Sequence, residues 1–145
     1  MNAQRATALI ADDEPLLRDE LAFLLAEAWP ALEIVARARN GREAIELYEA
    51  HKPDVCFLDV QMPGLSGIDA ARTIGAGAHL VFVTAFDQYA LKAFEQGVLD
   101  YLVKPVEPAR LAQAVARVQA RLHSAQLADA GADLRVAAVA QQFTA

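Results

Sequence analysis

The sequence is short of charge and of basic residues, and both shortages exclude classes of protein. Only 22% of its 145 residues are charged, and 13 Lys and Arg stand against 19 Asp and Glu, which gives a net charge of −6. Nucleic-acid binding by this chain itself would need a basic face for phosphate contacts, so the balance argues against that role. The 55% content of hydrophobic residues argues against disorder and predicts a well-filled core.

Cysteine, histidine and long apolar runs are also scarce. A single cysteine excludes an internal disulfide, and Cys56 lies in an apolar run, which predicts a packed side chain and not a nucleophile. His51, His79 and His123 lack any H-x-x-x-H spacing, so we expect no metal site from them. The first apolar run, residues 6–11, is too short for a secretory signal, and no run approaches the ~18 residues of a membrane span. We therefore expect a cytoplasmic protein without a membrane segment.

Five short apolar runs rich in Val, Ile, Leu and Phe alternate with helical patterns. The runs predict strands over residues 7–11, 32–38, 55–58, 79–84 and 99–103. Apolar spacing and end signals predict helices from Pro15 to near Trp29, over 42–51 with Asn40 as cap, over 67–74, over 88–96 between Asp87 and Gly97, and from Pro108 to at least His123. This alternation is typical of βαβ units, so we predict an α/β fold with a doubly wound, five-stranded parallel sheet and five helices on its faces.

The five units leave room for one domain, which we place at residues 1–123. Residues 124–145 are Ala-rich and lack a core of their own, so we expect a linker or a helical extension there. In the last helix, alternating steps of four and three separate the members of an apolar stripe: Leu111, Val115, Val118, Leu122 and Ala125. The stripe either packs on the sheet or, beyond about Leu122, outruns it and pairs with a second copy or leads into another domain.

Polar residues follow four of the five predicted strands. Asp12 and Asp13 follow the first strand, Asp59 follows the third, Thr84 ends the fourth, and Lys104 follows the fifth. Each alone has a structural explanation as a helix cap, a turn, a strand residue or a solvent-exposed end. In an open parallel sheet, however, ligands bind beyond the carboxyl ends of the strands, and all of these side chains arrive at that edge. Their joint placement favours a functional site.

The chemistry of these residue types fits phosphoryl transfer. Clustered carboxylates repel one another, and a hard cation such as Mg²⁺ relieves the repulsion with an open position for a phosphate. We predict that Asp13 and Asp59, supported by Asp12, hold Mg²⁺ and that a carboxylate attacks phosphorus. Thr84 and Lys104 would then bind the phosphoryl oxygens.

Four segments, "ADDE", "FLDVQMPGLSG", "VFVTA" and "DYLVKP", together resemble the receiver domain of two-component response regulators over about residues 6–123. The resemblance implies a flavodoxin-like fold with strand order 2-1-3-4-5. It also implies that a sensor histidine kinase phosphorylates Asp59, and that Asp12, Asp13 and the backbone carbonyl of Gln61 complete the Mg²⁺ site. A receiver catalyses only its own phosphorylation and slow dephosphorylation, so we do not expect an enzyme acting on other substrates.

The same resemblance assigns the remaining site residues. Lys104 is the phosphate-binding residue, and Lys104–Pro105 is expected as a cis peptide bond, which proline makes accessible. Thr84 and Tyr101 are the switch: on phosphorylation, Thr84 moves toward the phosphoryl group and Tyr101 turns inward from a more exposed rotamer.

Residues 81–111 resemble receivers of the LytTR (LytR/AlgR) class, whose output is a downstream DNA-binding domain that regulates transcription. We expect such an output domain to lie outside this chain and to make any contact with DNA. We also expect phosphorylation to strengthen a homodimer through the 88–96 helix, the fifth strand and the last helix.

Two other functions compete with this one. A phosphohydrolase of the haloacid-dehalogenase type also forms a phosphoaspartate, but it needs a second acid two residues after the nucleophile, and Gln61 stands there. A degenerate receiver would keep the fold for docking and would never be phosphorylated, although the functional positions all carry the required residue types. Acetyl phosphate distinguishes the three, because a hydrolase turns over, a receiver labels itself once, and a degenerate domain does neither.

Overall fold

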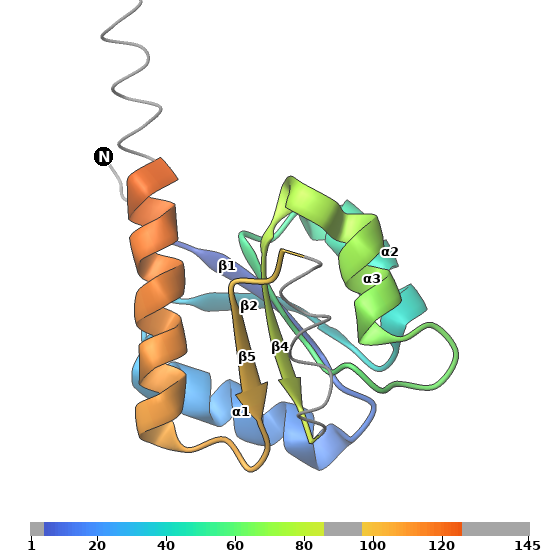
Figure 1. Cartoon of the computed structure of the whole chain (residues 1–145), viewed down its shortest axis with the longest axis horizontal. Coiled ribbons are helices and arrows are strands. Elements are labelled where there is room, and N and C mark those ends of the chain that lie inside the picture. The colour runs from blue at the N-terminus through green and yellow to red at the C-terminus, as the bar shows by residue number, and fades with distance from the viewer. Residues whose placement is uncertain (1–4, 86–96, 126–145) are drawn as a thin grey trace, which may run out of the picture.

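A five-stranded parallel sheet forms the centre of the computed structural model, which describes residues 5–85 and 97–125 (Figure 1). Its strands lie in the order β2-β1-β3-β4-β5, and every neighbouring pair is parallel. The strands are β1 (Thr7–Ala11), β2 (Glu33–Ala38), β3 (Val55–Leu58), β4 (His79–Thr84) and β5 (Asp100–Val103). The doubly wound fold and its strand order are thus confirmed, with each strand within one residue of its predicted start.

The helices of the described ranges follow the predicted pattern. They are α1 (Pro15–Ala28), α2 (Gly41–His51), α3 (Gly67–Ile74) with the short η1 (Gly75–Gly77) after it, and a C-terminal helix over residues 108–125. Asn40 caps α2 as predicted, since its side chain accepts the Glu43 N–H at 2.8 Å. The helix predicted over 88–96 lies outside the described residues. None of the helices in the two ranges has the length and apolar character that a bilayer span requires.

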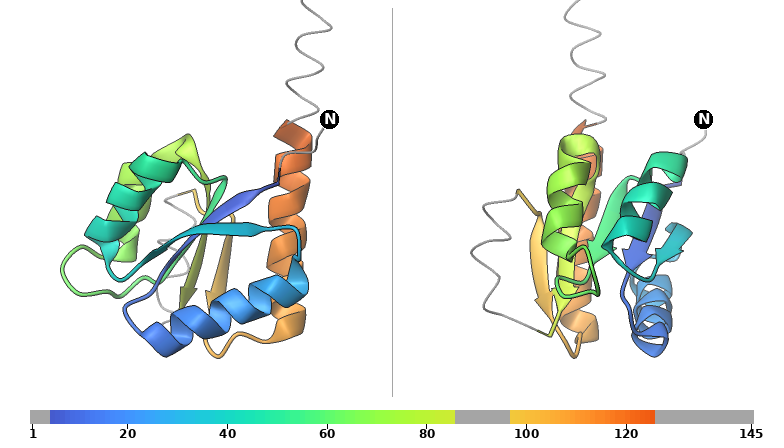
Figure 2. Two further views of the ribbon diagram at one scale, coloured as in Figure 1. Left: turned by 180° about the vertical axis from the view of Figure 1, so that it is seen from behind. Right: turned by 90° about the vertical axis from the view of Figure 1, so that its right-hand side faces the viewer.

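A hydrophobic layer covers each face of the sheet, so the strands are buried on both faces. On one face, alternate strand residues pack against α1 and the C-terminal helix; on the other, the intervening residues pack against α2 and α3 (Figure 2). Cys56, on β3, is fully buried in the second layer, and burial raises the pKa of its thiol to about 12. The prediction of a packed, unreactive cysteine is confirmed.

The apolar stripe of the C-terminal helix packs mainly on the chain's own sheet. Leu111, Val115 and Val118 are buried in the layer shared with α1, and Leu122 is half-buried. Residues 123–125 are exposed. Of the two explanations for the stripe, packing on the sheet therefore holds up to Val118.

A buried carboxylate joins this helix to β5. Asp100, the first residue of β5, is 1% exposed and accepts hydrogen bonds from Arg110 Nη2 at 2.6 Å and Nη1 at 3.1 Å. Arg117 lies 3.2 Å away, and the Tyr101 N–H donates to the same carboxylate at 2.8 Å. Burial alone would raise the pKa of Asp100, but the hydrogen bonds and charges of the two arginines outweigh it and leave the pKa below its ordinary value.

Removing this carboxylate should weaken the fold. We expect Asp100→Ala to lower the free energy of unfolding in urea by about 1–3 kcal/mol at pH 7, because the Arg110 and Arg117 guanidinium groups lose a buried partner. Asp19→Ala is the matched control, since Asp19 pairs with Arg37 on the exposed surface, and it should change stability by less than about 1 kcal/mol. Equal effects of the two variants would contradict the role given to Asp100.

The contribution of Asp100 should also depend on pH. A carboxyl group whose pKa is lower in the folded state stabilises fully above its unfolded-state pKa, about 3.9, and stops stabilising as the pH falls through the folded value. The stability difference between the wild type and Asp100→Ala should therefore be constant between about pH 5 and 7 and shrink below about pH 4. A difference that grows on acidification would count against this interpretation.

Candidate functional site

The carboxyl ends of the strands bring the predicted polar side chains together at one edge of the sheet. Asp12, Asp13 and Asp59 each place a carboxylate oxygen within 4.8 Å of the others. Asp12 and Asp59 are buried, whereas Asp13 is exposed. The Lys104 ammonium donates to Asp12 Oδ2 at 2.5 Å and to Asp59 Oδ2 at 3.0 Å. Fully buried Thr84 ends the neighbouring strand β4.

Asp12 combines a structural role with its place in the site. Its N–H donates to the Ala38 carbonyl at 3.0 Å, which continues the pairing of β1 with β2, and its Oδ1 accepts the Glu14 N–H at 2.9 Å at the start of α1. Arg18, in the first turns of α1, donates to the Asp12 carbonyl at 2.7 Å. Sequence reasoning missed Arg18, because a side chain that binds a backbone carbonyl leaves no pattern of residue types.

Asp59 is held by the loop that follows it. Its N–H donates to the Ala11 carbonyl at 2.9 Å, and its Oδ1 accepts the Gln61 N–H at 3.3 Å. At the start of α3, the Gly67 N–H donates to the Val60 carbonyl at 2.8 Å. A Cβ at Gly67 would lie only 1.9 Å from the Asp59 carbonyl oxygen, so any other residue there must displace the aspartate's backbone. The sequence indicated position 67 only as the start of a helix.

Burial and charge act in opposite directions on the acids and the lysine. Burial raises the pKa of Asp59 above its ordinary value, and the Lys104 ammonium and hydrogen bonding with Thr84 only partly oppose this rise. For Lys104, burial would lower the pKa, but hydrogen bonds and attraction from Asp12 and Asp59 prevail and leave it raised. Lys104 is therefore held as the ammonium ion, whereas burial opposes the charged form of Asp59.

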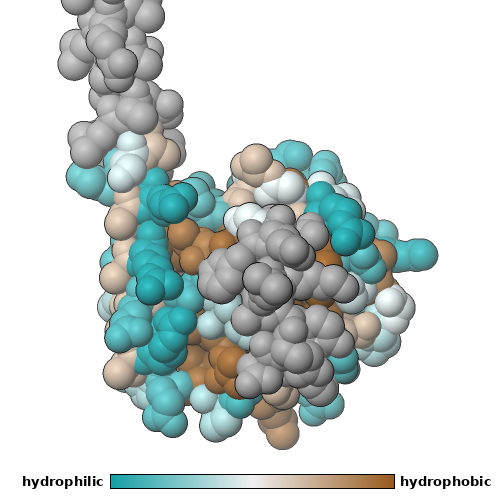
Figure 3. Space-filling view, viewed as in Figure 1, coloured by the Kyte–Doolittle hydropathy of each residue, from teal (hydrophilic) through white to brown (hydrophobic). Residues whose placement is uncertain are grey.

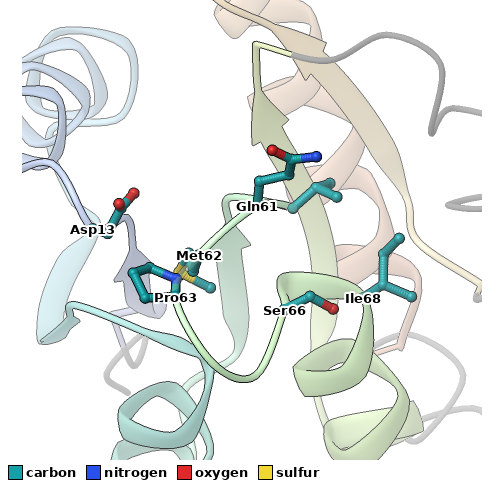
Figure 4. A pocket seen from close by; sticks show the side chains of 7 residues that line it. Asp13, Gln61, Met62, Pro63, Ser66 and Ile68 are labelled. Carbon is teal, nitrogen blue, oxygen red and sulfur yellow. The ribbon is translucent and has the colours of Figure 1, made fainter.

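The donor set fits a hard divalent cation. Three carboxylates in reach of one another supply the oxygen ligands that Mg²⁺ prefers, and exposed Asp13 leaves one side open to solvent. A hollow of about 490 Å³ lies on that side, with Asp13 and Gln61 on opposite walls and Met62 and Pro63 between them (Figure 4). The Gln61 carbonyl stays a predicted metal ligand, and the Gln61 N–H places this residue beside the Asp59 carboxylate.

Tyr101 lies inside the protein, beside the end of β4. It is 7% exposed and packs edge-on against Phe82, with ring centroids 6.2 Å apart and planes at 78°. The two residues are direct neighbours on β5 and β4, so packing between the strands holds the ring in this position. The predicted movement of Thr84 and Tyr101 on phosphorylation stays a prediction. The Lys104–Pro105 peptide bond is cis, as expected from the sequence.

Comparison with known families and proteins gives a consistent result. The family described as "Response regulator receiver domain" matches residues 8–116. A response regulatory protein of Vibrio cholerae, itself uncharacterized, is 50% identical over 125 residues, which are 84% of this chain and 48% of that protein. The transcriptional regulatory protein BtsR of Escherichia coli K12 is 44% identical over 77% of this chain and 47% of its own length. The chain thus spans about half the length of these curated relatives.

Solved structures show the same similarity. The REC domain of AraT, a response regulator from Geobacillus stearothermophilus, superposes with a TM-score of 0.78 at 34% identity, covering 85% of this chain and 99% of that one. A chain of the CheX-CheY-BeF3-Mg+2 complex from Borrelia burgdorferi superposes with a TM-score of 0.72 at 26% identity, covering 78% of this chain and 88% of that one.

Proposed function

The chain belongs to the response regulator receiver domain family, a family of signalling modules and not of metabolic enzymes, and we propose that it accepts a phosphoryl group from a sensor histidine kinase on Asp59. One observation carries this proposal. Asp12, Asp13 and Asp59 meet at one sheet edge, and the Lys104 ammonium bonds to two of them. A helix-capping or turn role would explain any one of these side chains but not their convergence.

In the proposed reaction, an Asp59 carboxylate oxygen attacks the phosphorus of a phosphohistidine. A P–O bond forms while the P–N bond breaks, and the imidazole leaves with the bonding electron pair. Lys104, 3.0 Å from Asp59, and Thr84 at the end of β4 bind and neutralise the phosphoryl oxygens. Asp12, Asp13, Asp59 and the Gln61 carbonyl would hold Mg²⁺, which supplies further charge neutralisation when bound. The similar Borrelia complex, whose name includes BeF3 and Mg+2, supports this assignment.

The surface of α1 supports a protein as the phosphoryl donor. Leu16 and Phe23, two turns apart, are 81% and 65% exposed. Beside them lies a mainly apolar hollow of about 290 Å³ between α1 and the segment after β5, and its walls include Asp12 and Lys104. Exposed apolar side chains around a hollow mark an interaction surface, and here it leads to the phosphorylation site. We place the kinase on this surface, which we call the α1 surface.

The output should be transcriptional. Resemblance to the LytTR class and to BtsR, a relative named as a transcriptional regulatory protein, supports a DNA-binding domain after a receiver at residues 1–123. Residues 124–145 would connect the two. A protein of this kind works in the cytoplasm.

We assign the switch to Thr84 and Tyr101. A phosphoryl group adds about −1.5 to −2 charges and new acceptor oxygens, which draw Thr84 toward it. Tyr101 would turn inward from a more exposed rotamer into the space that Thr84 leaves, and the buried position against Phe82 is the one it would then occupy. The rearranged face, which includes β5 and the C-terminal helix, would then favour a homodimer.

The labelling reaction tests the proposed function directly. With acetyl phosphate and Mg²⁺, the chain should incorporate one phosphoryl group, and Asp59→Asn or removal of Mg²⁺ by a chelator should abolish incorporation. Asp13→Ala should raise the Mg²⁺ concentration required by about tenfold or more, because a carboxylate ligand is lost. Asp19→Asn, on the exposed side of α1, is the control and should label normally. Full labelling of Asp59→Asn would refute the proposal, continuous turnover would indicate a hydrolase, and no labelling of the wild type would indicate a degenerate receiver.

Phosphotransfer from kinases tests the α1 surface. In a profile against the sensor kinases of the source organism, Phe23→Ala should slow transfer from the cognate kinase by about tenfold, the effect expected for a buried interface residue. Labelling by acetyl phosphate, which needs no docking, should be unchanged. Arg42→Ala, exposed on α2 across the sheet, should transfer normally. A normal transfer rate for Phe23→Ala would remove the kinase from this surface while leaving the Asp59 assignment intact.

Sedimentation velocity tests the proposed dimer. The chain should sediment as a weakly associating species alone and as a tighter dimer with beryllofluoride and Mg²⁺. The Asp59→Asn variant, which lacks the carboxylate that beryllofluoride binds, should not respond. Monomers in both states at high concentration would show that phosphorylation does not control self-association in this chain.

A further inference from the structure

A third hollow lies at the edge of the sheet opposite to the phosphorylation site. It has a volume of about 720 Å³ and is bounded by the starts of β4 and β5, the turn after α3, and the far end of the C-terminal helix. The hollow lies where β4 and β5 begin, whereas Asp59 and Lys104 follow the opposite strand ends (Figure 1). Gly75 and Gly97 stand at its rim, and neither has an atom within 4 Å of where a Cβ would be, so the rim is open.

The hollow contains two basic side chains in an acidic protein. His79, the first residue of β4, is half-buried, and Arg121 reaches the hollow from the C-terminal helix. Arg110 and Arg117 on the same helix both bond to Asp100. Within residues 5–85 and 97–125, by contrast, no carboxylate lies within salt-bridge distance of Arg121. Hydrophilic side chains line this helix along its border with the sheet (Figure 3).

The electrostatic environment of His79 disfavours its protonated form. Burial lowers the pKa of His79, Arg121 lowers it further, and only Asp54 acts in the opposite direction. The Asp54 carboxylate already accepts the Thr7 N–H at 2.8 Å and the Thr7 hydroxyl at 3.3 Å. Arg121 and His79 thus border the same hollow. An anion placed between them would attract the Arg121 guanidinium and would favour a proton on the His79 ring.

We propose that this hollow binds an oxyanion, the phosphate or carboxylate group of a ligand, between the Arg121 guanidinium and the His79 imidazole. A guanidinium presents paired N–H donors that match two oxygens of either group, and a protonated imidazole adds a third donor. Binding takes up a proton at His79 and strengthens as the pH falls. The site is separate from Asp59 and does not depend on phosphorylation.

Proton NMR of the histidines tests the site in the whole chain. Inorganic phosphate and sodium acetate are titrated separately at constant ionic strength, with sodium chloride as the reference anion. His79 should show a saturable shift, and its pKa should rise in the presence of the bound anion because the anion favours the protonated ring. His51 and His123, both exposed, are internal controls in the same spectrum and should shift only weakly and without saturation.

Substitutions test whether Arg121 binds the anion together with His79. Arg121→Ala should abolish the saturable shift of His79, Arg121→Lys should retain a weaker one because it keeps the charge without the paired donors, and Arg42→Ala should bind as the wild type does. A response to phosphate alone identifies a phosphate ligand, and a response to acetate alone identifies a carboxylate. The proposal is overturned if neither anion saturates His79, if chloride has the same effect, or if Arg121→Ala binds normally.

Discussion

Repulsion between carboxylates is the constraint around which the carboxyl edge of this sheet is organised. Asp12 and Asp59 end adjacent strands, so the parallel pairing of β1 and β3 forces their side chains together. Neither is relieved by solvent, because both are buried. The Lys104 ammonium relieves the repulsion between the two carboxylates. Lys104 follows β5, which lies two strands away from β3 in the sheet. The lysine ammonium is therefore a cation built into the site. A metal cation would reach the carboxylates through the open hollow, where Asp13 is exposed.

The backbone around the site is fixed as firmly as its charges. The carbonyl of Asp12 is bound by Arg18, and the carbonyl of Asp59 is in close contact with the chain at Gly67. Both acids thus stand on backbone whose position is set by the following helix. This arrangement is a form of preorganisation, because the carboxylates are held together by the fold itself.

Strand ends were the most informative feature of the sequence. Short apolar runs gave the strands, and in a parallel sheet the residues after those runs must share an edge, so Asp12, Asp13, Asp59, Thr84 and Lys104 were predictable as a group. Contacts that depend on the path of the backbone were not predictable. Arg18 binds a backbone carbonyl, and Arg110 binds Asp100, which lies ten positions earlier in the sequence. Neither contact follows the spacing of a helix or a strand. The edge-on packing of Tyr101 against Phe82 was not predictable either, because it depends on the register between β4 and β5.

The attachment of the C-terminal helix has a mechanical consequence. Arg110 and Arg117 fix this helix to the start of β5, and Arg110 also lies 3.4 Å from the carbonyl of Tyr101. The helix is therefore anchored at two points, and the anchor at Arg110 includes the backbone of Tyr101. With a rise of 1.5 Å per residue, its end at residue 125 extends about 12 Å beyond Arg117, so a tilt of about 5° about that anchor would move the end by about 1 Å. A movement at the start of β5 would thus be passed along the helix to its exposed end.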